Sequence, residues 1–135
     1  MRQSGTFEFH SHTHEHLRWD RLGAGSIDRK CAGLSRDLGR ARAMLKERLG
    51  AVSDHLCWPQ GYYDADYERV AASAGFRHFY TCEPGSNLPR GDESDTRPHA
   101  ITRLEARNKP HGWLASRLGV HTRPLLSMAY LKIKR

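Results

Sequence analysis

A single apolar stripe with helical spacing constrains the fold of this chain more than any other feature. Apolar residues recur every three or four positions from Ile27 to Leu49, which is the periodicity of one buried helix face. Ser26 precedes the stripe at the position of an N-cap, and Gly50 follows it as a C-terminal cap. The sequence therefore predicts a long amphipathic helix over residues 27–49.

Short apolar runs alternate with helical segments along the chain. A second helix is predicted after the first, with Asp64 or Asp66 as its N-cap. Strands are predicted in four short runs, at residues 6–12, 55–58, 76–82 and 101–106. Because alternating strands and helices favour parallel strands joined by crossover helices, the predicted fold class is α/β.

The length of the chain limits how complete such a fold can be. At 135 residues the chain has room for one domain core. A barrel of eight strand–helix units needs at least about 200 residues, so only part of a barrel is expected. An incomplete barrel leaves an open sheet edge, which predicts poor solubility or formation of a homo-oligomer through that edge.

Charge is concentrated near the end of the chain. Residues 97–135 contain nine Lys and Arg but only one acidic residue, Glu105. We expect residues 1–106 to form the partial α/β domain and residues 107–135 to form a basic helical extension. Basic residues in this segment are interleaved with Trp113 and Tyr130, so binding of an anionic polymer is an alternative function.

Cysteine usage and hydropathy exclude several classes of protein. Three cysteines without a Cys-x-x-Cys pair suggest neither a disulfide framework nor a cysteine zinc site. No apolar run approaches the roughly 18 to 20 residues of a membrane span, and the first residues have no signal-peptide core. The sequence as written therefore predicts a cytoplasmic protein.

Four histidines alternate directly after the first predicted strand, at His10, His12, His14 and His16. Neutral imidazole is a common ligand of zinc. On a straight strand neighbouring histidines would lie about 6.6 Å apart, which is long for one ion, but a helical turn after His12 would bring residues four apart together. The pattern predicts a zinc site at His12 and His16, or at His10 and His14; the alternative is a solvated cluster.

A proline turn follows the second predicted strand, over residues 58–61. Backbone N–H groups in such a turn can face a cleft, which makes the Gln60 N–H a candidate donor to an oxyanion. Trp58 and Tyr62 offer flat aromatic faces of the kind that line ligand sites. The alternative is an ordinary turn with core aromatic residues.

Together these motifs resemble the polysaccharide deacetylases of carbohydrate esterase family 4. The resemblance rests on three segments. Residues 7–16 are a predicted strand end followed by a His-Ser/Thr-x-x-His pattern, and residues 57–63 contain a Pro-x-Gly turn. In residues 75–87 a predicted helix ends in Gly-Phe. It implies a distorted (β/α) barrel, truncated here at the N-terminus. It also implies metal-dependent hydrolysis of N-acetyl, or occasionally O-acetyl, groups on a glycan.

The resemblance favours one pair of histidines over the other. In the family a Glu-Ile-Gly-Ser segment precedes the first ligand, and it aligns with residues 8–11. Apolar residues follow the second ligand at spacings that match Trp19 and Leu22. His12 and His16 are thus the implied metal ligands, with Gln60 as oxyanion donor and with Trp58 and Tyr62 against the sugar.

The chain also departs from the family pattern. It lacks the Thr-Phe-Asp-Asp motif, whose aspartates act as general base and third metal ligand, and Cys57 stands where an arginine usually orients the base. No Leu-x-His motif supplies a general acid, and the histidines at 78, 99, 111 and 121 are expected at the surface. The expected function is a catalytically incomplete deacetylase of glycans. Whether the chain is itself an enzyme stays open, with a non-catalytic metal- or glycan-binding module as the alternative.

Overall fold

A computed structural model describes residues 4–18, 25–87, 99–106 and 108–134 of the chain. Its helices and strands follow one another in the order α1 (Ile27–Leu49), β1 (His55–Cys57), the 3-10 turn η3 (Pro59–Gly61), α2 (Ala65–Ser73), β2 (His78–Tyr80), β3 (His99–Ile101), α3 (His111–His121) and α4 (Pro124–Lys134). The α/β class is confirmed.

Both predicted helices of the α/β core form, and they begin at predicted caps. Ser26 accepts a hydrogen bond from the Arg29 N–H at the start of α1, and Gly50 ends this helix in the left-handed conformation with a φ of 73°. Asp64 caps α2 by accepting from the Tyr67 N–H at 2.8 Å. The capping chemistry therefore fixes the ends of both helices locally.

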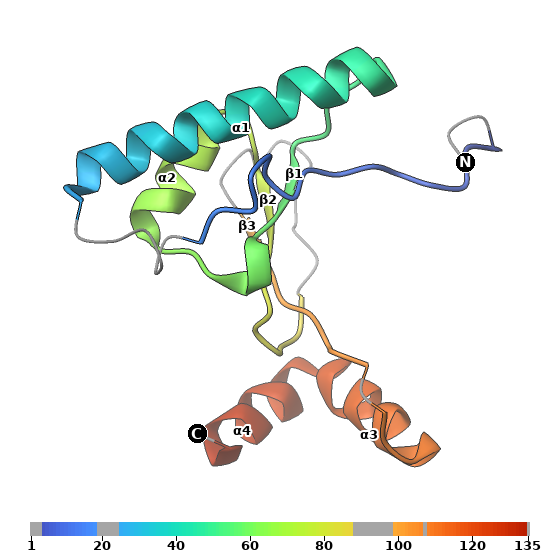
Figure 1. Cartoon of the computed structure of the whole chain (residues 1–135). Coiled ribbons are helices and arrows are strands. Elements are labelled where there is room, and N and C mark those ends of the chain that lie inside the picture. The colour runs from blue at the N-terminus through green and yellow to red at the C-terminus, as the bar shows by residue number, and fades with distance from the viewer. Residues whose placement is uncertain (1–3, 19–24, 88–98, 107, 135) are drawn as a thin grey trace.

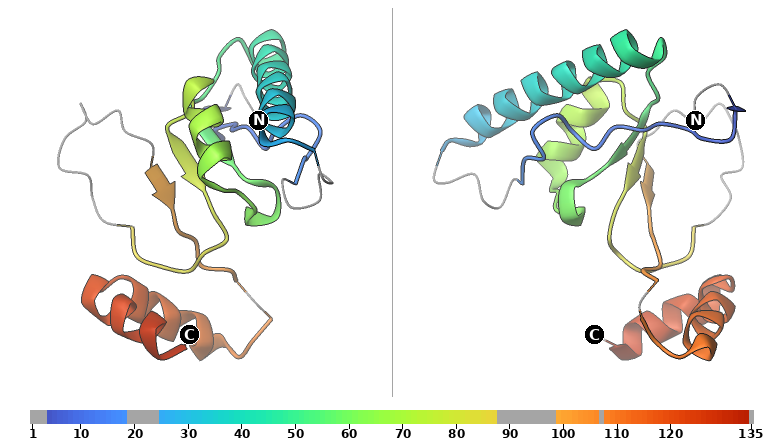
Figure 2. Two further views of the ribbon diagram at one scale, coloured as in Figure 1. Left: turned by 90° about the vertical axis from the view of Figure 1, so that its left-hand side faces the viewer. Right: turned by 45° about the vertical axis from the view of Figure 1, so that its right-hand side comes forward.

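The strands form one parallel sheet in the order β1-β2-β3. In its register His55 is the partner of His78, and His78 is in turn the partner of His99. Helices α1 and α2 pack together on one face of this sheet (Figure 1). Figure 2 shows that α3 and α4 form a hairpin beyond the ends of the strands, away from the other two helices.

One hydrophobic core lies between the sheet and its two helices. Its aromatic rings contact one another, with the Trp58 and Phe79 centroids 5.6 Å apart. The core consists of buried side chains from α1, β1, α2 and β2 and the segments beside them, namely Leu34, Leu38, Leu56, Trp58, Tyr67, Ala71, Phe76 and Phe79. The middle of the predicted stripe on α1 is therefore the part that packs, whereas Ile27 at its start is 47% exposed.

Two of the strand predictions are wrong in detail. Residues 6–12 form no strand; only Ser11 pairs with Leu56, as an isolated parallel bridge, and the chain turns at Thr13, whose φ is 64°. The last strand is β3 rather than residues 101–106, because past Ile101 the Thr81 carbonyl accepts from the Arg103 side chain and the Arg103 N–H donates to the Glu83 carbonyl instead. The regular ladder therefore stops at Ile101, and the described residues contain three strands.

The basic C-terminal part forms two helices, as expected, but its packing was not anticipated. His121 is buried and hydrogen-bonds Ser127 at 2.7 Å, so the prediction of a surface histidine is wrong there. Several apolar side chains of α4 remain exposed, including Leu125 and Ile133. Within the described ranges no helix has the length and apolarity needed to cross a membrane. The division at residue 106 and association through the sheet edge stay predictions.

The core predicts a clear contrast between two positions on α1. Leu38 is fully buried, so Leu38→Ala should lower the free energy of unfolding by about 2–5 kcal/mol, the usual cost of such a cavity. Met44 on the same helix is 38% exposed, and Met44→Ala should cost much less. Urea denaturation followed by circular dichroism measures both, and equal losses would contradict this core assignment.

Candidate functional site

The structure brings His12 and His16 together in the loop between Ser11 and α1. Their ring centroids lie 4.8 Å apart in an edge-to-face arrangement. The predicted helical turn after His12 is wrong, because the loop instead turns through two left-handed residues, Thr13 with a φ of 64° and His16 with a φ of 54°. The two imidazoles therefore meet through a tight non-helical loop that strains the backbone at two positions.

One ring nitrogen of His12 has a defined role. Its Nδ1 lies 2.8 Å from the carbonyl oxygen of Cys57, the last residue of β1. Since a carbonyl can only accept, Nδ1 carries a proton, and Nε2 is the nitrogen that has a lone pair in the neutral ring. Metal-binding histidines in proteins are commonly held in this way, with the second nitrogen on a backbone carbonyl. His12 is thus held at the carboxyl end of β1, with its Nε2 not used by this hydrogen bond.

Asp37 holds the loop between the two histidines against α1. Its carboxylate is only 3% exposed and accepts hydrogen bonds from the His14 N–H at 2.9 Å and the Glu15 N–H at 2.7 Å. Asp37 is not among the residues predicted from the sequence to support the site. A signal was present, since Asp37 lies three residues after Leu34 and four before Ala41, on the buried face of the predicted helix.

The other two histidines of the motif do not join this pair. His10 stacks on His55 of β1 with a centroid distance of 4.5 Å, and its Nδ1 lies 2.9 Å from the Ser53 hydroxyl. The side chain of His14 is exposed. Trp19 and Leu22, which supported the choice of pair in the sequence, lie outside the described residues.

The proline turn lies at the end of β1, next to the carbonyl that binds His12. Gln60 adopts a φ of 53°, and Gly61 follows with a φ of 77°. A Cβ on Gly61 would lie 2.6 Å from Cβ of Cys82, so only glycine fits this position. Within the described ranges, the Gly61 N–H donates to the Trp58 carbonyl and the Tyr62 N–H to the Pro59 carbonyl, whereas the Gln60 N–H has no backbone acceptor outside the turn.

The two aromatic residues predicted to line the site have different environments. Trp58 is 1% exposed and stacks on Tyr63 with a centroid distance of 5.7 Å, so the prediction that it offers a face to a ligand is wrong. Its ring packs in the hydrophobic core instead. Tyr62 is 42% exposed, and the guanidinium carbon of Arg18 lies 3.8 Å from its ring centroid. Tyr62 is therefore the aromatic side chain that a ligand can reach.

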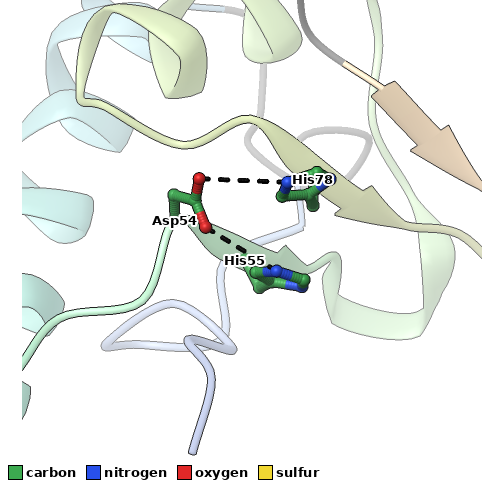
Figure 3. A group of neighbouring side chains, drawn as sticks. All are labelled: Asp54, His55 and His78. Atoms are coloured by element: carbon green, nitrogen blue, oxygen red, sulfur yellow. Dashed lines mark ion pairs between the residues drawn. The ribbon is translucent and has the colours of Figure 1, made fainter. Parts of the chain in front are cut away.

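A second group of ligand-type side chains lies at the opposite end of β1. Asp54, His55 and His78 approach one another there (Figure 3), with one possible ligand atom of each within 4.8 Å of the others. His78 is half-buried, so the prediction of an ordinary surface histidine does not describe it. No local sequence pattern indicates this group, because His78 lies 23 residues after His55 in the chain.

Comparison with known proteins identifies the family. The model of the polysaccharide deacetylase family matches residues 1–79, which is more than half of the chain. This chain belongs to the polysaccharide deacetylase family. The family match covers the histidine pair, the proline turn and the Asp54–His55–His78 group, whereas α3 and α4 lie beyond it. A search of curated proteins finds no match.

Solved structures support the same fold. The structure of a de-N-acetylase from Aggregatibacter actinomycetemcomitans matches with a TM-score of 0.69 and 20% identity over 87% of this chain and 50% of that one. IcaB from Ammonifex degensii matches with a TM-score of 0.64 and 22% identity over 85% and 47%. The BpsB deacetylase domain from Bordetella bronchiseptica matches with a TM-score of 0.57 and 22% identity over 74% and 46%. The chain thus spans about half the length of these three structures.

The contacts of Asp37 predict a local effect of its loss. In the Asp37→Asn variant the side chain retains one acceptor oxygen for two N–H donors, so we expect stability to fall by about 1–3 kcal/mol. Hydrogen exchange of the His14 and Glu15 amides should become faster. Asp28→Asn, in the exposed first turn of α1, is the matched control. Unchanged exchange at both amides would contradict the role of Asp37.

Proposed function

We propose that this chain takes part in metal-dependent removal of N-acetyl, or O-acetyl, groups from a glycan. One observation carries the proposal: two imidazoles lie 4.8 Å apart beside the proline turn, in a chain of the polysaccharide deacetylase family. Two of the similar structures are those of a deacetylase domain and of a de-N-acetylase. An acetylated glycan is therefore the substrate class that we propose for this chain.

Two of the described residues have the chemistry to bind a divalent ion, although they do not complete a ligand set. His12 and His16 would hold it, and the hydrogen bond to Cys57 leaves Nε2 of His12 free to do so. A bound zinc ion would polarise the acetyl carbonyl and lower the pKa of a water molecule towards neutrality. Among the described residues no third His, Cys, Asp or Glu completes a ligand set with this pair, whereas catalytic zinc sites usually have three protein ligands. We propose that the third ligand and the general base come from outside the described residues.

The proline turn would position the acetyl group. The Gln60 N–H would donate to the oxyanion that forms when water attacks the carbonyl. The strained conformation of the turn, with positive φ at both Gln60 and Gly61, keeps this donor in place without reorganisation during the reaction. The exposed ring of Tyr62 would contact the apolar face of the sugar.

Metal titration tests the ligand pair. Isothermal calorimetry with Zn²⁺ should show that a His12→Ala/His16→Ala variant binds one equivalent less than the parent chain, because both proposed ligands are gone. His14→Ala removes a histidine from the same loop and should keep the full stoichiometry. Loss of binding in the His14 variant, with retention in the double variant, would show that the other pair of histidines holds the ion.

Acetate release from N-acetylglucosamine oligomers tests the reaction itself. We expect release to require added Zn²⁺ and to fall to background in the His12→Ala/His16→Ala variant. Release that persists in this variant would contradict the proposed roles. A parent chain that binds Zn²⁺ through this pair without releasing acetate would instead be a non-catalytic binding module.

A further inference from the structure

Three ligand-type side chains meet at the amino ends of β1 and β2, away from the His12–His16 pair. Asp54 directly precedes β1, while His55 and His78 are the first residues of β1 and β2 and are partners in the parallel ladder. Their rings therefore stand side by side, with centroids 4.3 Å apart. Figure 3 shows the Asp54 carboxylate between the backbone and these two rings, with one oxygen directed to each ring.

The nitrogen and oxygen atoms of these groups lie farther apart than hydrogen-bonded atoms usually do. Nε2 of His55 lies 3.6 Å from Oδ1 of Asp54, and Nε2 of His78 lies 3.9 Å from Oδ2. Hydrogen bonds between such atoms are usually no longer than about 3.2 Å. Two ligand atoms on one tetrahedral zinc ion lie about 3.3 Å apart. Small side-chain rotations would thus bring all three groups within reach of one ion.

Neighbouring residues determine which nitrogen of His55 and which oxygen of Asp54 can bind an ion. The Tyr80 hydroxyl lies 3.0 Å from Nδ1 of His55, which leaves Nε2 of that ring for the side of Asp54. The Arg77 guanidinium binds Oδ2 of Asp54 at 2.6 Å, so Oδ1 is the oxygen that is more available to an ion. This arrangement of a fixed outer nitrogen and a fixed carboxylate is typical of the surroundings of metal ligands.

The group could also be a purely ionic network of one carboxylate and two imidazolium rings. Burial, together with the neighbouring His78 and His10, lowers the pKa of His55 and so favours its neutral form. Burial alone would raise the pKa of Asp54, but the hydrogen bond and charge of Arg77 outweigh it and lower that pKa. Independently of these pKa values, one possible ligand atom of each of the three groups lies within 4.8 Å of the others, which is the geometry that a single ion can use.

We propose that Asp54, His55 and His78 bind one zinc ion, which joins the amino ends of β1 and β2. The three side chains are 26–30% exposed, so an ion can enter and a water molecule can occupy the fourth position. This site differs from the His12–His16 pair, which meets β1 at its carboxyl end through Cys57. Its role is to stabilise the pairing of two short strands, and it takes no part in acetyl transfer.

Zinc titration of the His12→Ala/His16→Ala variant isolates this second site. We expect this variant to retain one equivalent of Zn²⁺ and to show a thermal midpoint that rises with Zn²⁺ concentration. Adding His78→Gln or His55→Gln should weaken the remaining binding at least about tenfold and abolish the rise. His99→Gln is the matched control, because His99 is the next partner in the same register but is not one of the three ligands.

The outcomes separate this proposal from the proposed function. Loss of all Zn²⁺ binding in a folded His12→Ala/His16→Ala variant overturns the second site and leaves the first intact. Undiminished binding after His78→Gln overturns it as well. If the glutamine variants fail to fold, Co²⁺ added to the His12→Ala/His16→Ala chain should shift the ring protons of His55 and His78 more than those of His99, and equal shifts would overturn the proposal.

Discussion

A buried carboxylate supports the candidate site. Asp37 lies on the inner face of α1, where an unpaired charge would be strongly destabilising. Two backbone N–H groups of the histidine loop satisfy it, and the same bonds hold that loop in a strained conformation with positive φ at Thr13 and His16. The position of the histidine pair therefore depends on the packing of α1, and α1 in turn depends on the core residues Leu34 and Leu38.

The strand β1 connects the two groups of ligand-type residues. Its carboxyl end presents the Cys57 carbonyl to His12, and it is followed by the turn that carries Gln60. Its amino end begins with His55, beside Asp54 and His78. In parallel α/β folds the carboxyl ends of the strands are where catalytic groups gather, and the amino ends serve stability. The two proposals follow this division, with acetyl chemistry at one end of β1 and a strand-joining ion at the other.

The local patterns of the sequence predicted much of the fold. The stripe from Ile27 to Leu49 and the cap at Ser26 predicted α1 closely, because helix periodicity and capping are properties of neighbouring residues. The pairing of His12 with His16 was also among the predictions, although the loop that produces it was not. Trp58 was misplaced because an aromatic ring beside a turn is equally compatible with a ligand site and with a core. Only the packing of Phe79 and Tyr63 against it decides between these environments.

By itself the sequence determined the bounds of α1, the α/β class and the residue types that can bind a metal ion, since each of these depends on groups close together in the chain. The tertiary structure alone decided which of those groups meet. It placed Asp37 under the histidine loop, ended β3 at Ile101 through the contacts of Arg103, and set His55 beside His78. The physical reason is that these hydrogen bonds and this strand register join residues more than 10 positions apart. Such contacts cannot be recognised from the periodicity of neighbouring residues.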